Sequence, residues 1–119
     1  MVARTSALIL VSVLVLGGLF LLLRPEAPDT APGERSFDLE MCENGMRPEE
    51  VSVREGDRVA MSIRSESRIG LHIHGYDIER EVEPGETTDL SFEADLTGRF
   101  PMENHETERE LGVLVVEPR

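Results

Sequence analysis

The chain has 119 residues, of which 39% are hydrophobic, so it has room for one small domain and little else. All 24 Asp and Glu residues follow Arg24, against ten Arg and no Lys, so that part of the chain carries a formal charge of about −14. This charge disfavours nucleic acid and anionic lipid surfaces as partners and attracts cations or a basic protein, although a solvated surface alone also explains it.

The first predicted element is an apolar helix. Residues 7–23 run without a charge between Arg4 and Arg24, which is the short end of a transmembrane helix and slightly long for a signal-peptide core. Because no small-residue cleavage site and no lipobox cysteine follow, we favour an uncleaved anchor over residues 1–24. The positive-inside rule then leaves the N-terminus in the cytoplasm and the rest of the chain in the periplasm. The predicted location is therefore the inner membrane, crossed once.

The next two regions differ sharply in composition. Residues 25–34 contain three prolines and no large apolar residue, which is typical of a stiff polar tether. From residue 35 to residue 119, apolar and polar residues alternate with a period of two. Turn residues such as Gly56-Asp57 and Pro84-Gly85 separate the short apolar runs. Seven or eight short strands are expected, which predicts an all-β, antiparallel sandwich or barrel.

Several fragments, in order, resemble the cupredoxin family. Residues 46–59 are similar to the family's opening, and His74-Gly75-Tyr76 resembles the first copper histidine in the cupredoxin domains of cytochrome c oxidase subunit II and nitrous oxide reductase. The fragments that resemble later strands of the family are residues 82–85, 90–92, 98–100 and 111–116. The resemblance covers about residues 37–118 and implies a Greek-key β-sandwich that binds copper.

The sequence departs from this family at the copper loop. Blue and purple copper cupredoxins have a cysteine six residues after the glycine that corresponds to Gly98, followed by His and Met. Here that position is Asn104, His105 comes next and no Met follows. The chain is most similar to bacterial cupredoxin-like proteins that keep the His-Gly-Tyr motif and one late histidine. The resemblance thus implies a copper ligand at His74 but no blue electron-transfer centre.

All three histidines lie in the segments 71–77 and 98–105. On a strand, His72 and His74 project from one face, Tyr76 continues that row, and the residues between them face the other way. We predict that His74 and His105 bind a metal, with copper as the expected ion. His72 is a third candidate, which a half-exposed strand position explains equally well.

The remaining ligands would decide the metal's oxidation state. Two imidazoles with water or a carboxylate suit Cu(II) or zinc, whereas a thioether in the set would suit Cu(I). The thioether candidates are Met102, Met46 and Met41, and the nearby acids include Glu103 and Asp77.

The single cysteine, Cys42, cannot form an internal disulfide. It is buried, free, paired with another chain or a metal ligand. Cys42 and Met46 are soft ligands, and cysteines from two chains of a homodimer could bridge a dinuclear, purple-type copper site. Core packing explains Met46 and Met41 equally well.

These observations support one leading hypothesis and two alternatives. The leading hypothesis is a membrane-tethered, periplasmic copper-binding protein with a non-blue site, for copper handling or delivery to a membrane oxidase or another exported copper enzyme. The first alternative is electron transfer by an intersubunit copper site built on Cys42. The second is a metal-free protein-interaction module. No phosphate loop, nucleophile elbow or zinc-protease motif is present, and we expect no enzyme activity.

Overall fold

The computed structural model describes residues 2–25 and 31–119, and its contacts divide the chain into two units, residues 1–30 and 31–119. In the first unit, α1 (Val2–Leu22) exposes its large apolar side chains. The segment Arg4–Leu22 has a mean hydropathy of 2.5 and is long and apolar enough to cross a membrane. A signal sequence has the same features. The core of the predicted tether, residues 26–30, lies outside the described residues.

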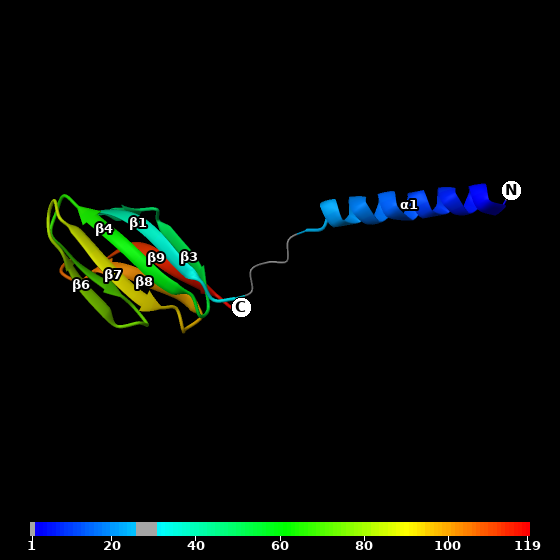
Figure 1. Ribbon diagram of the computed structural model, residues 1–119. Coiled ribbons are helices and arrows are strands. Elements are labelled where there is room, and N and C mark those ends of the chain that lie inside the picture. The colour runs from blue at the N-terminus through cyan, green and yellow to red at the C-terminus, as the bar shows by residue number, and fades with distance from the viewer. Residues whose placement is uncertain (1, 26–30) are drawn as a thin grey trace. The chain divides into compact units, whose positions relative to one another are not determined.

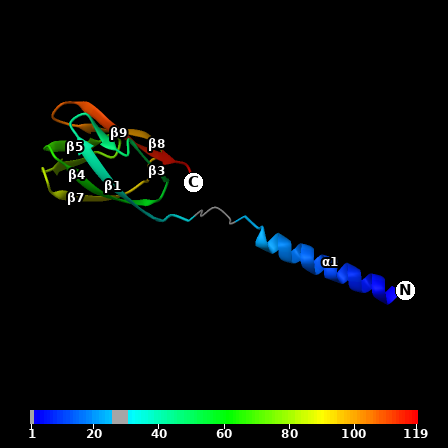
Figure 2. The same cartoon turned by 90° about the horizontal axis from the view of Figure 1, so that it is seen from above.

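In the second unit, all described regular structure is β-strand, which confirms the predicted fold class. The strands are β1 (Glu34–Cys42), β2 (Gly45–Arg47), β3 (Glu50–Arg54), β4 (Arg58–Ser65), β5 (Ile69–Ile73), β6 (Ile78–Val82), β7 (Thr87–Glu93), β8 (Gly98–Asn104) and β9 (Arg109–Glu117). They form a four-stranded sheet in the order β2-β1-β4-β7 and a five-stranded sheet in the order β3-β9-β8-β5-β6, which face each other as a sandwich (Figures 1 and 2).

The sequence had led us to expect antiparallel pairing throughout. The two sheets nevertheless contain two parallel pairs of strands. β1 pairs with β4 in parallel, and β3 pairs with β9 in parallel. The reason is that the chain leaves the four-stranded sheet after β2, forms β3 in the other sheet, and returns as β4 beside β1. A strand that returns after such a crossover can run in the same direction as its neighbour, which a tight hairpin does not allow.

The core lies between the two sheets, where the period-two alternation predicted it. In β4, Val59, Met61 and Ile63 are at most 1% exposed and face the other sheet, while the residues between them are more exposed. Burying each such side chain contributes about 1.5–3 kcal/mol. Met41 and Met46, at 4% and 3% exposure, belong to this core, so their sulfur atoms pack rather than face solvent.

A buried carboxylate, Asp57, joins three separated parts of the domain. It is fully buried, and its oxygens accept hydrogen bonds from the backbone N–H groups of Gly33 and Arg54, each at 3.0 Å. It also pairs with the guanidinium of Arg119, and Arg35 lies 3.5 Å away. Burial alone would raise the pKa of Asp57, but the two hydrogen bonds and the two cations outweigh burial and lower it.

Candidate metal centre

The histidine pair begins on β5, in the five-stranded sheet. Leu71 and Ile73 are at most 1% exposed and point into the core, so His72 between them points to the outer face of the sheet. His72 is only partly exposed, with 19% of its side chain accessible. The outer face of the sheet, rather than the interior of the sandwich, therefore carries this imidazole.

His74 directly follows β5 and is held beside β8. Its backbone N–H donates to the carbonyl of Pro101 at 3.0 Å. Its ring lies next to that of His72, with the two centroids 4.5 Å apart. The prediction that these two histidines share a face is therefore confirmed.

Tyr76 does not continue the row, contrary to our expectation. Gly75 at φ +81° and Asp77 at φ 52° reverse the chain after His74, and Tyr76 then packs against the core between two aromatic rings. Its hydroxyl donates to the carbonyl of Leu96 at 2.8 Å and accepts from that residue's N–H at 3.0 Å. Burial raises the pKa of Tyr76.

The neighbouring strand adds a carboxylate to the pair. β5 and β8 are antiparallel, and their register puts Glu103 directly opposite His72. Glu103 Oε1 lies 2.5 Å from His74 Nε2 and 4.0 Å from His72 Nδ1. One ligand atom from each of the three residues lies within 4.8 Å of the others, which is the spacing of a set that could share one metal ion. We call His72, His74 and Glu103 the His-His-Glu cluster.

The nitrogen of His74 within this cluster lacks a hydrogen bond. Its Nε2 is buried from solvent, and the short approach of Glu103 Oε1 does not have hydrogen-bond geometry. A buried polar atom without a partner costs about 1–3 kcal/mol. A metal ion held by both atoms would remove that cost, because imidazole nitrogen and carboxylate oxygen are both good ligands of Cu(II) and zinc. The residues present therefore fit a metal.

His105 lies at the edge of this cluster. It begins the turn after β8, it is exposed, and its N–H donates to the carbonyl of Gly70 at 2.7 Å. Its ring centroid is 6.4 Å from that of His72. It packs over Gly70, where an added Cβ atom would lie 3.5 Å from the Cβ of His105, an ordinary van der Waals distance. The structure thus puts His105 beside His72, whereas we had expected it to approach His74.

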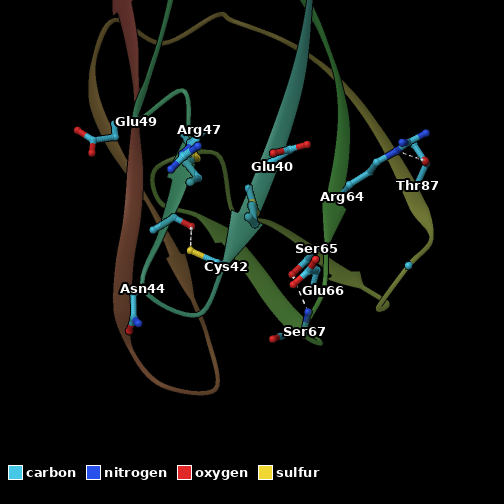
Figure 3. A pocket seen from close by; sticks show the side chains of 14 residues that line it. Glu40, Cys42, Asn44, Arg47, Glu49, Arg64, Ser65, Glu66, Ser67 and Thr87 are labelled. Atoms are coloured by element: carbon cyan, nitrogen blue, oxygen red, sulfur yellow. Dashed lines mark hydrogen bonds between the residues drawn. The ribbon is translucent and has the colours of Figure 1, made fainter.

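The sulfur-containing candidates lie elsewhere. Met102 is opposite Ile73 in the sheet and is fully buried in the core, so it points away from the two histidines. Cys42 ends β1 in the four-stranded sheet, where its exposed thiol donates to the carbonyl of Gly45 at 3.4 Å (Figure 3). It lines a pocket of about 830 Å³ together with Met41 and Met46. These residues do not join the His-His-Glu cluster.

Comparisons with known proteins concern the fold. No protein-family model and no curated protein matches the chain. Among solved structures, the multicopper oxidase mgLAC is similar over 72% of this chain and 39% of its own, with 21% identity and a TM-score of 0.61. The chain thus spans about two fifths of that oxidase.

Two smaller chains are matched over most of their length. One is a chain of a heme-copper terminal oxidase dimer, covered over 99% of its length and 97% of this one, with 18% identity and a TM-score of 0.59. The other is the metal-binding domain of the Streptococcus pneumoniae Cu(I)-exporting P-type ATPase CopA, covered over 90% of its length and 74% of this chain, with 14% identity and a TM-score of 0.61. The domain has a cupredoxin-like fold.

In this cupredoxin-like domain, Asn104 stands where the resemblance puts the copper-loop cysteine. Asn104 is 2% exposed, and its Oδ1 accepts a hydrogen bond from the N–H of Glu106 at 3.1 Å. Its side chain therefore stabilises the turn that carries His105. An amide is a poor ligand for copper compared with a thiolate.

Proposed function

We propose that this chain is a membrane-tethered, periplasmic copper-binding protein that carries copper for handling or delivery. The His-His-Glu cluster would supply three ligands, and His105 lies at the edge of the site beside His72. Copper is then cargo rather than a resident cofactor. The plausible recipients are a membrane oxidase or another exported copper enzyme.

One observation carries the proposal, namely the convergence of His72, His74 and Glu103, in which His74 Nε2 is shielded from solvent, lacks a hydrogen bond and lies against the carboxylate. Two imidazoles and a carboxylate form a competent set for a divalent transition metal, and among these metals Cu(II) binds most tightly to a given nitrogen and oxygen site. The copper proteins among the fold neighbours support copper in particular.

The place of the cluster on the outer face of a sheet favours carriage over catalysis. A site on the outer face of a sheet can meet another protein directly. The apolar helix α1 and the positive-inside rule support a position on the periplasmic side of the membrane.

Copper titration of the full chain in detergent tests this proposal. We expect one Cu(II) per chain, with the double variant His72→Ala/His74→Ala binding more weakly by well over the roughly 10–100-fold that the loss of a single outer-shell partner costs, because two direct ligands are lost. His105→Ala should cause a smaller loss. Glu110→Ala is the control, because Glu110 faces Glu103 across β8 and β9 but lies outside the cluster. Unchanged binding by the double variant would contradict the proposal.

The same titration separates the two alternatives. An intersubunit site would give a purple, copper-dependent dimer that disappears in Cys42→Ser. Met46 is buried in the core, which does not favour its use in such a site. A metal-free interaction module would retain no copper in any variant.

A further inference from the structure

We infer that the His-His-Glu cluster takes copper in its oxidised, divalent state and releases it when it is reduced to Cu(I). This inference rests on the proposed function and names the oxidation state of its cargo. Its basis is that the fold brings nitrogen and oxygen ligands together on the outer face of the five-stranded sheet and keeps sulfur ligands away from it.

The atoms within reach are two imidazole nitrogens and one carboxylate oxygen. Carboxylates bind hard cations, imidazoles bind Cu(II) and zinc well, and Cu(I) is selected by thiolate and thioether sulfur. Glu103 also contributes a negative charge, and the charge of a dication interacts with it twice as strongly as that of a monocation. Both effects favour Cu(II) over Cu(I).

Two features of the fold keep sulfur atoms away from the His-His-Glu cluster. One is the alternation of side chains along β8, and the other is the division of the strands into two sheets. Met102 is the sulfur-containing residue nearest to Glu103 in the sequence. Side chains alternate along β8, so Met102 points into the core when Glu103 points to the outer face. The other described methionines, Met41, Met46 and Met61, are at most 4% exposed and lie in the core. Cys42 belongs to the other sheet. Among the described residues, no sulfur therefore faces the cluster.

The release step is a one-electron reduction. An external one-electron donor, for which ascorbate serves as the probe, reduces Cu(II) to Cu(I). The two copper–nitrogen bonds and the copper–oxygen bond then break, and Cu(I) passes to an acceptor with thiol, thioether or aromatic-nitrogen ligands. The protein itself is neither oxidised nor reduced, and its three ligands remain available for another Cu(II) ion.

Two competition measurements on the full chain in detergent test the inference. Cu(II) affinity is measured against nitrilotriacetate, and Cu(I) affinity against bicinchoninate under ascorbate without oxygen. We expect Cu(II) to bind at least about tenfold more tightly than Cu(I). We also expect the paramagnetic signal of the Cu(II) form to vanish on reduction while copper moves to bicinchoninate.

A ligand exchange at Glu103 sharpens the test. Glu103→Met replaces the carboxylate with a thioether and should shift the ratio of the two affinities towards Cu(I) by about 10–100-fold. Glu110→Met is the matched control, because it removes the same charge at the position directly opposite Glu103 and should leave the ratio nearly unchanged. Equal shifts in both variants would show a general charge effect and overturn the inference.

The remaining outcomes separate this inference from the proposed function. If the natural chain binds Cu(I) as tightly as Cu(II), the inference is wrong while copper binding stands. If it binds neither ion at the His-His-Glu cluster, both the inference and the proposed function fail.

Discussion

Gly75 follows His74 in the turn between β5 and β6, where the backbone has φ +81°. This conformation is strained for residues with a Cβ atom. The space is also taken, because a Cβ atom at Gly75 would lie 2.4 Å from Cδ1 of Phe100. The turn and the ring of Phe100 thus require glycine here, and this turn ends the strand at the point where His74 lies beside His72.

Replacing Gly75 with alanine should therefore destabilise the domain. We expect a loss of about 2–4 kcal/mol in the free energy of unfolding, from the backbone strain and the clash together. Gly85→Ala separates the two causes, because Gly85 has φ +74° but no atom near its Cβ position; it should cost about 1–2 kcal/mol. Thermal unfolding followed by circular dichroism measures both, and equal losses would contradict a role for Phe100.

At this scale, the sequence predicted part of the cluster. The alternation of Leu71, His72 and Ile73 was enough to put His72 on the outer face, because side-chain direction in a strand depends only on parity. The place of Glu103 depends instead on the register between β5 and β8. The sequence named Glu103 and Asp77 as nearby acids, but register follows from long-range pairing, so local sequence could not decide which of the two joins the histidines.

At the scale of elements, the period of two correctly predicted strands and a sandwich. It did not predict the parallel pairs β1–β4 and β3–β9, because alternation carries no information on strand direction. Nor did it single out Asp57. The Gly56-Asp57 turn was expected, but its link to Gly33 and Arg119 exists only once distant segments meet.

Asp57 makes the stability of these joined elements depend on pH. Its pKa lies below the ordinary value of 3.8 in the folded state. Its stabilising contribution is therefore fully present above the pKa of the unfolded chain, about 3.9, and is lost as the pH falls through the folded pKa.

The variant Asp57→Asn tests this dependence. It should lose about 1–3 kcal/mol at pH 7, because charge-assisted hydrogen bonds are lost. As the pH falls from about 5 through the folded pKa of Asp57, the variant should then lose less further stability than the natural chain. Asp38→Asn, at an exposed position of β1, should follow the natural chain. Parallel pH profiles of unfolding for all three proteins would show that Asp57 does not contribute in this way.

At the scale of the whole molecule, the apolar helix α1 is the segment that a membrane anchor or a signal sequence would use. If it is an anchor, the full chain should stay at its full mass in the membrane fraction after a carbonate wash, because about 17 apolar residues suffice to hold it. A chain without residues 1–24 should stay out of that fraction. Cell fractionation with mass spectrometry measures both. A shortened, soluble periplasmic form of the full chain would show instead that the segment is a cleaved signal.

The parallel pairing of β1 with β4 also has a mechanical consequence. A pull on the domain from its N-terminal side enters at Gly33, which Asp57 holds, and continues along β1. The ladder between β1 and β4 runs from Glu34 to Met41, so a load along the strand shears all of its hydrogen bonds together instead of opening them one by one. Asp57 also holds Arg119, which follows β9, and Arg119 donates to the carbonyl of Ala31, so part of this load passes to the five-stranded sheet as well. A load on residues 31–33 would therefore be shared between the two sheets.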